Sequence, residues 1–393
     1  MIKKKKEMVN KISNYLSEWS KIILRLLIYK EERKRLLKER EIRKMQDREL
    51  PDKFDKNCTK LIVFVVPGAN WHTGEETISG GILSIASLYE ETLKLKEIHQ
   101  SEVIMMTGPG EYLLFKHIKF ENNISVFRFE QLFSYFEQLE YVLFHIPEFR
   151  VVKFISPKYS KLIKQLSRID YVHINILNQN IRLMPEPDVV NQLKQIASIV
   201  TQTTAHEKYT TFEIRQKWDI PLHRFSVFGS PEKYIKSDFA EKKKLMIISP
   251  DKNPEKEDIL SIVRENFEDY RQIVIRNMPY QVYRQTITKA KFSFTFGEGL
   301  DFYFLETVFS GGIGIAVYNE EFFPKNWFAL PGIFNSFEDL KQNVSIFLQR
   351  AKESEANYKH IHEQQYRACS LLYSYSEYQE NIRKFYLKEY KFV

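Results

Sequence analysis

The chain has 393 residues, of which 43% are hydrophobic and 14% aromatic, and this is enough apolar material for two ordinary domains. Residues 1–50 hold 16 of the 59 Lys/Arg and 8 of the 51 Asp/Glu, so the net charge of +8 lies in this segment and the remainder holds 43 of each sign. A neutral body argues against nucleic acid binding, and the two cysteines, Cys58 and Cys369, exclude a disulfide framework or zinc cluster and favour a reducing cytosol.

Residues 1–50 are predicted to form a basic amphipathic helical extension. Apolar side chains recur at steps of three and four between residues 12 and 27, which makes one helical face, and Pro51 ends the segment. Such a helix can lie on an anionic membrane surface. It can equally pack on the protein's own body or on a partner, and disorder is the third interpretation. We expect no secretory signal and no membrane-spanning helix, because no apolar run reaches roughly 20 residues.

Residues 55–235 are predicted to form a Rossmann-like domain. Leu61–Val66 is a continuous apolar run, typical of a strand covered on both faces. Further strands are expected at 103–107, 124–127, 141–145, 171–176, 198–202 and 225–228, and helices reach to about 95 and cover about 157–168 and 205–217. Alternating strands and helices favour a parallel sheet.

A second Rossmann-like domain is predicted over residues 245–352, after a polar linker at 237–244. Strands are expected at 245–249, 272–275, 292–296 and 313–317, with helices near 256–266, 279–290, 301–310 and 336–352. Residues 354–393 read as an aromatic helix that crosses back to the first domain. Because ligands of open parallel sheets bind beyond the carboxyl ends of the strands, the residues that follow strands are the candidates for function.

The segment Phe294–Glu306 is predicted to be a strand, a tight glycine turn and a helix. Glu298 falls in the turn between Gly297 and Gly299, and Glu306 lies on the helix. Carboxylates accept hydrogen bonds from sugar hydroxyls, the glycines allow close approach, and the helix amino terminus favours phosphate. Two glutamates at this spacing also arise by chance, and the setting after a buried strand is what favours a ligand site.

Glu298-Gly-Leu-Asp-Phe-Tyr-Phe-Leu-Glu306 resembles the Glu, seven residues, Glu motif of the retaining GT-B glycosyltransferases, a group that includes bacterial capsule and lipopolysaccharide sugar transferases. Leu300-Asp301 stands where Phe-Gly is usual. The resemblance implies that Glu298 lies beside the donor sugar and that Glu306 binds the nucleotide ribose. It extends over roughly residues 60–350.

The same resemblance supplies the other donor-site candidates. Gly80 and Gly81 match the family's glycine-rich loop, although the segment also suits a simple helix start. Lys256 fits the family's phosphate-binding lysine. The arginine that usually accompanies it is absent from its place, and Arg276 after the next strand, or Lys252, is the substitute.

Several residues after strands of the first half are weaker candidates. His145 stands where the family often has a histidine that faces the donor sugar, but a strand-end histidine is also a common core group. Asn178 and Gln179 follow the next strand, where amides suit hydroxyl-rich ligands and turns alike. His72 and Glu75, in the loop after the first strand, are candidate acceptor contacts.

These features predict a metal-independent hexosyltransferase that moves a sugar from a nucleoside diphosphate to a glycan or lipid-linked acceptor in surface polysaccharide synthesis. The chain has no Asp-x-Asp pair and no clustered His/Cys set, so we expect neither metal nor cofactor. The expected location is the cytoplasmic face of the cell membrane, reached through residues 1–50, within a polysaccharide assembly complex. The alternatives are a nucleotide-sugar epimerase and a degenerate transferase that acts as a scaffold.

Overall fold

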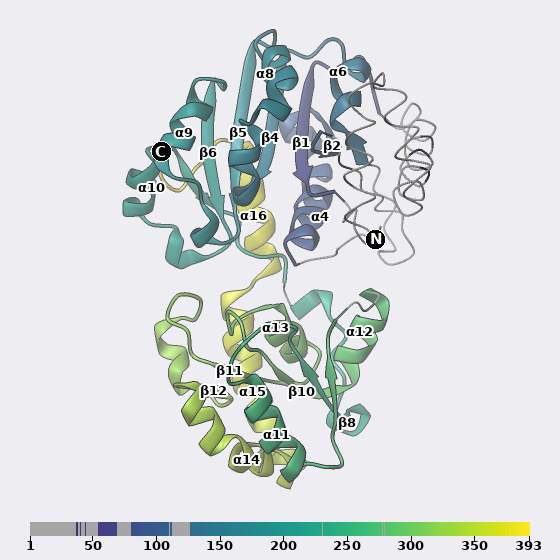
Figure 1. Cartoon of the computed structure of the whole chain (residues 1–393), viewed down its shortest axis with the longest axis vertical. Helices are drawn as coiled ribbons and strands as arrows, with labels where there is room; N and C mark the ends of the chain where they lie inside the picture. Colours follow the sequence, from purple (N-terminus) through teal and green to yellow (C-terminus); the bar gives the residue numbers. More distant parts are fainter. Residues whose placement is uncertain are drawn as a thin grey trace, which may run out of the picture.

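The computed structural model describes residues 54–68, 80–109, 111, 126–229, 231–276, 278 and 280–393, together with residues 37, 40 and 44. The predictions for residues 1–50 and for His72 and Glu75 therefore lie outside the described residues. Two α/β domains lie one above the other, and the chain passes between them twice (Figure 1). No helix among the described residues is both long and apolar enough to cross a bilayer.

The first domain is built on a seven-stranded parallel sheet in the order β3-β2-β1-β4-β5-β6-β7. Six of the seven residues of β1 are buried, because its apolar run is covered on both faces. The strands are β1 (Lys60–Val66), β2 (Glu102–Thr107), β3 (Val126–Arg128), β4 (Tyr141–Pro147), β5 (Tyr171–Asn178), β6 (Ile199–Thr204) and β7 (Leu222–Arg224).

Helices cover both faces of this sheet and bury two separate apolar clusters. One cluster lies under α8 and α9, and the other lies under α4 and the last helix, α16. The helices of this domain are α4 (Gly80–Leu93), α5 (Lys96–His99), α6 (Leu132–Tyr135), α7 (Val151–Phe154), α8 (Ser160–Leu166), α9 (Pro187–Lys194) and α10 (Phe212–Trp218).

The second domain has a five-stranded parallel sheet in the order β12-β11-β10-β8-β9. Its strands are β8 (Lys243–Ile248), β9 (Arg271–Val274), β10 (Ala290–Phe294), β11 (Ile313–Val317) and β12 (Ile333–Phe334). Its helices are α11 (Lys256–Asn266), α12 (Tyr280–Lys289), α13 (Phe302–Phe309), α14 (Phe337–Glu353) and α15 (Glu355–Leu372). The predicted pair of Rossmann-like domains is confirmed.

The carboxyl-terminal segment forms two helices instead of the single predicted one. Ser374 caps a new helix, α16 (Tyr375–Tyr386), by accepting a hydrogen bond from the backbone amide of Glu377 at 3.3 Å. Helix α15 stays on the second domain, whereas α16 lies on the first (Figure 1). The backbones of Leu222 and Phe392 then exchange hydrogen bonds of 2.8 and 3.0 Å, which fixes the chain end to β7.

Three sequence predictions differ from the structure in placement. The strand expected at 225–228 lies earlier, at 222–224, because Ser226 adopts a left-handed φ of 66° that ends the extended chain. The helix expected from 205 begins only at Phe212. The polar linker at 237–244 contains Lys242, which is buried because its ammonium group donates to the carbonyls of Thr288 and Ser310 at 2.9 and 2.6 Å.

Candidate functional site

The turn between β10 and α13 holds Glu298 in a fixed backbone frame. Gly299 has a φ of +84°, and a Cβ there would lie 2.6 Å from the Phe323 ring and 2.9 Å from the carbonyl oxygen of Val317. Only glycine fits such a position without strain. The Asp301 carboxylate caps α13 by accepting from the backbone amide of Phe304 at 3.1 Å. The turn is therefore locked at both ends.

Gly297 brings the loops after β8 and β10 into contact. A Cβ at Gly297 would lie 2.9 Å from the carboxylate carbon of Asp251, which follows β8. A larger residue would push these two loops apart. Both loops begin at the same edge of the sheet. Gly297, which the sequence predicts to allow a close approach, is approached here by the Asp251 side chain.

Glu298 lies at the junction of the two domains. The Asn180 side chain, which follows β5 of the first domain, donates to Glu298 Oε1 at 3.4 Å. Burial, reinforced by the negative charge of Asp251, raises the pKa of the half-buried Glu298 carboxyl above its usual value. Asn180 directly follows Asn178 and Gln179, the two amide residues that the sequence analysis named as candidates.

Glu306 is the fifth residue of α13, and only 2% of its surface is exposed. Tyr234 donates to Glu306 Oε1 at 2.9 Å, Tyr283 donates to Oε2, and Arg284 lies 3.8 Å from Oε1. Burial raises the pKa of Glu306 despite these partners. A ribose hydroxyl that reached this carboxylate would take the place of one tyrosine hydroxyl. The sequence prediction missed all three partners.

Lys256 and Arg276 line one cavity of about 620 Å³ at the carboxyl ends of β8 and β9. The Lys256 ammonium group donates to the carbonyls of Ser249 and Asp251 at 2.5 and 3.0 Å, and burial lowers its pKa. Asp251 lines the same cavity and contacts Gly297, so the cavity borders the Glu298 turn. The cavity is lined by Pro250, Asp251, Lys252, Asn253, Pro254, Lys256, Glu257, Leu260, Val274 and Arg276.

His145 lies in the interior of the first domain. Its side chain is 0% exposed, stacks on Phe64 with ring centroids 4.5 Å apart, and is hydrogen bonded to Tyr386 of α16 at 3.1 Å and to Asn175 at 3.0 Å. Burial holds its pKa well below the usual value. The structure thus places His145 beneath α16, and we do not include it among the proposed catalytic residues.

The amide residues after β5 occupy different environments. Gln179 donates to the carbonyl of Gly81 at 3.3 Å, which joins the β5 end to the start of α4 at Gly80. Asn178 is only 2% exposed, and neither of its side-chain amide atoms has a partner among the described residues. The buried carboxylate of Glu148 accepts from the backbone amides that follow Asn178, at 3.2 and 3.1 Å. Burial raises the Glu148 pKa to about 7.

Side chains from both domains meet beside this site. Arg182, after β5, forms an ion pair with Glu321 of the second domain, and Tyr209 donates to the carbonyl of Glu321 at 3.4 Å. The rings of Phe228 and Phe302 stack with centroids 4.6 Å apart. These contacts join the segments after β5, β6 and β7 of the first domain to the loop after β11 and to the amino terminus of α13.

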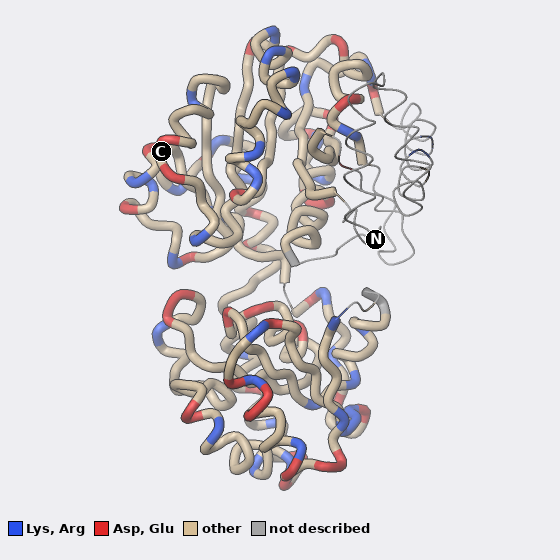
Figure 2. Tube along the Cα trace, viewed as in Figure 1, with Lys and Arg blue, Asp and Glu red and all other residues tan. Residues whose placement is uncertain are grey.

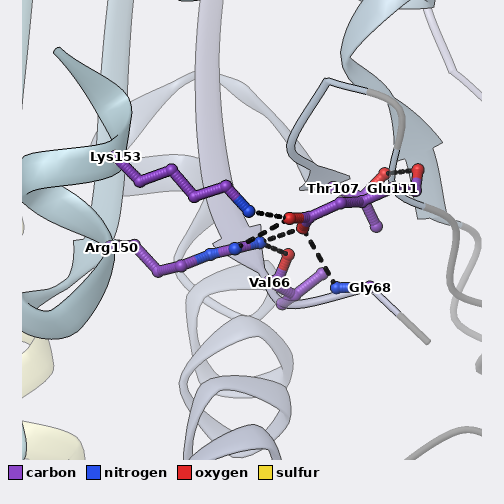
Figure 3. Close-up of polar contacts among 6 residues, drawn as sticks. All are labelled: Val66, Gly68, Thr107, Glu111, Arg150 and Lys153. Atoms are coloured by element: carbon purple, nitrogen blue, oxygen red, sulfur yellow. Dashed lines mark hydrogen bonds and ion pairs between the residues drawn. The ribbon is translucent and has the colours of Figure 1, made fainter. Parts of the chain in front are cut away.

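A separate polar cluster lies at the carboxyl ends of β1 and β2 (Figure 3). Glu111, after β2, accepts hydrogen bonds from Arg150 and from Lys153 of α7. The backbone amide of Gly68 also donates to Glu111, at 3.3 Å. Burial alone would raise the pKa of Glu111, but these donors and the two positive charges lower it to about 2.

The low pKa of Glu111 predicts that its contribution to the stability of the protein depends on pH. A folded-state pKa below the unfolded value stabilises the protein above pH 4.5, and this stabilisation is lost as the pH falls through about 2. We expect Glu111→Gln to lower the free energy of unfolding by about 3 kcal/mol at pH 7. The difference from the wild type should shrink to less than half at about pH 3. Urea unfolding of both proteins at the two pH values measures this, and a difference that does not depend on pH would contradict it.

The surface charge of the two domains is mixed. Figure 2 shows basic and acidic residues interspersed along the described trace of both domains. This distribution agrees with the equal numbers of the two signs outside residues 1–50. The positive groups at the site are therefore local features and not part of a wide basic surface.

No family model and no curated protein matches the sequence. The fold of this chain does resemble those of solved structures. An α-glucosyltransferase in complex with UDP-glucose and DNA containing an abasic site has a TM-score of 0.51 and 10% identity, over 84% of this chain and 98% of its own. The lipopolysaccharide outer core galactosyltransferase WaaB has a TM-score of 0.50 and 10% identity, over 84% and 99%. The protein therefore has the two-domain GT-B fold of these glycosyltransferases.

Proposed function

We propose that this protein is a glycosyltransferase that moves a sugar, of hexose type, from a nucleoside diphosphate to a glycan or lipid-linked glycan. The observation that carries the proposal is the cavity after β8 and β9, which holds Lys256 and Arg276 and borders the turn that presents Glu298. Two cations suit a diphosphate, and the neighbouring carboxylate suits the attached sugar.

We propose one orientation for the donor in this site. Its diphosphate would lie between Lys256 and Arg276, and its sugar would extend toward Glu298 and the amino terminus of α13. Developing charge on the leaving diphosphate would be stabilised by the two cations and by the helix terminus, with no metal ion. Its ribose would reach Glu306 by displacing a tyrosine hydroxyl. Retention of configuration rests on the motif resemblance.

The acceptor would enter from the first domain. Asn180 contacts Glu298 directly, so groups near the end of β5 would lie beside the proposed donor sugar. We further propose that residues 1–50 hold the protein at the cytoplasmic membrane face, where a lipid-linked acceptor and an assembly complex for capsule or lipopolysaccharide would be found. Flotation with anionic liposomes of the full chain and of residues 51–393 tests this, since equal flotation of both removes the membrane role.

Calorimetric titration of the full chain with a panel of nucleoside diphosphates tests the donor site. We expect one nucleotide to bind, and the variant Lys256→Gln to bind it about tenfold more weakly because a charged hydrogen bond is lost. Lys244→Gln, at an exposed lysine near the start of β8 and so at the strand end opposite the cavity, is the matched control. A scaffold without donor function would bind none of the panel.

A radiolabelled donor then tests the reaction itself. We expect transfer of the label only when a glycan acceptor is added. An epimerase would convert the donor to its isomer without any acceptor, and that result would overturn the transferase proposal.

A further inference from the structure

In the cluster around Glu111, hydrogen-bond donors from three residues converge on one carboxylate (Figure 3). Arg150 donates to both carboxylate oxygens, with 3.0 Å from Nη1 to Oε1, and the Lys153 ammonium group donates to Oε1. The backbone amide of Gly68 completes the set at 3.3 Å. A paired guanidinium fork, an ammonium group and a backbone amide form the donor arrangement that proteins use for oxyanions in general.

Among the described residues, the arrangement carries one positive charge in excess. Two cations, Arg150 and Lys153, surround a single anion, and the Arg150 side chain is only 8% exposed. Arg150 Nη2 also donates to the carbonyl of Val66 at 3.2 Å, while its Nε has no partner among the described residues. A buried guanidinium without an anion is costly. The cradle formed by Arg150, Lys153 and the Gly68 amide therefore requires an anion at all times.

Glu111 is held in a way that allows its side chain to be replaced. Thr107 Oγ1 donates to the backbone carbonyl of Glu111 at 2.7 Å, so the backbone is anchored independently of the carboxylate. Rotation of the side chain alone would free the cradle. The Glu111 side chain is 16% exposed and that of Lys153 is 37% exposed, so the cradle opens to solvent on the side of these two residues.

The cradle lies where a ligand of this sheet is expected. Val66 ends β1, Thr107 ends β2, and Arg150 follows β4, so the carboxyl ends of three adjacent strands meet there. Open parallel sheets bind ligands at this edge. The cavity lined by Lys256 and Arg276 belongs to the other domain, and none of the cradle residues lines it.

We propose that Arg150, Lys153 and the Gly68 amide form a subsite for an oxyanion of the acceptor, and that the Glu111 carboxylate fills it when no acceptor is bound. The proposal rests on the proposed transferase function and adds to it that the acceptor is anionic. The shared chemistry is a phosphate or carboxylate group, which a phosphodiester-linked acceptor or an acidic sugar would carry.

Calorimetry with inorganic phosphate as the probe tests the subsite in the full chain. Glu111→Gln removes the carboxylate that competes with phosphate for Arg150 and Lys153. The variant should therefore bind phosphate about tenfold more tightly than the wild type, because phosphate no longer has to displace a charge-assisted contact. The double variant Glu111→Gln/Lys153→Gln should lose this gain. Because the first variant loses stability, added phosphate should also raise its melting temperature more than that of the wild type.

Equal phosphate affinities of wild type and Glu111→Gln, or a gain that persists in the double variant, would overturn the subsite. If Glu111→Gln does not fold, Glu111→Asp serves instead, because its shorter side chain draws the carboxylate back from Arg150 and should give a smaller gain. Glycerol 3-phosphate and glucuronate, titrated into the same variant, separate the two sources of the anion. Tighter binding of either supports the subsite, and binding of neither counts against it.

The outcome is separable from that of the donor site. Wild-type protein that binds a nucleoside diphosphate, with a phosphate affinity that Glu111→Gln leaves unchanged, would overturn only the oxyanion subsite. A phosphate gain in Glu111→Gln without any nucleoside diphosphate binding by the wild type would overturn only the transferase assignment.

Discussion

Replacing Glu306 with alanine is expected to weaken nucleoside diphosphate binding by up to about 100-fold, because one charge-assisted hydrogen bond from a ribose hydroxyl would be worth up to about 3 kcal/mol. The buried carboxylate also holds the hydroxyls of Tyr234 and Tyr283. The alanine variant loses both of these hydrogen bonds at the base of the site, so the free energy of unfolding should fall as well. Calorimetric titration and urea unfolding measure the two effects separately.

Two variants make this prediction specific. Glu306→Gln keeps the side-chain shape and one acceptor for a tyrosine hydroxyl, so it should fold more stably than the alanine variant while still binding nucleotide poorly. Glu353→Ala, at an exposed position at the end of α14, is the matched control and should bind as the wild type does. Wild-type affinity in Glu306→Ala would show that the ribose lies elsewhere.

The second large effect is expected at Glu298. Glu298→Gln should lower kcat by about 10²–10³-fold, the loss that follows removal of one preorganised electrostatic group from a reacting centre. Donor affinity should change by no more than about threefold, because an interaction made mainly in the transition state affects turnover and not ground-state binding. Steady-state kinetics and calorimetry with the same donor distinguish these quantities.

Glu320→Gln, at an exposed position beside the domain contacts, is the control for Glu298. The raised pKa of Glu298 adds a pH criterion: if its ionised form is required, activity should begin to fall on acidification at a higher pH than an ordinary glutamate would give. Full turnover in Glu298→Gln, or an acidic limb that this substitution leaves in place, would exclude the assigned role.

The sequence predicted the sheets and the Glu298 turn because local pattern determines them. Buried parallel strands are continuous apolar runs, and the glycines on either side of Glu298 indicate a turn directly from the local sequence. The family resemblance suggested Lys256 and Arg276 for one site, and the two side chains line one cavity at the carboxyl ends of β8 and β9.

Properties that depend on distant segments were not predictable from local pattern. Tyr234 and Tyr283 reach Glu306 from 72 and 23 residues away. His145 was correctly placed on a strand, but Tyr386, which covers it, lies 241 residues later. Lys242 looked like part of a polar linker, because a charge count does not reveal which lysine finds buried carbonyl partners.

The crossing of α16 has a consequence for the order of folding. Tyr378, Ile382 and Phe385, which are at most 2% exposed, complete the apolar cluster beneath α4 of the first domain, and all three lie on α16, which follows the whole second domain in the sequence. During synthesis the part of this sheet face that α16 covers therefore stays exposed until residues 375–386 have been made. Domains ordinarily fold in the order in which they are synthesised. Here the first domain can complete its core only after the second domain has been synthesised.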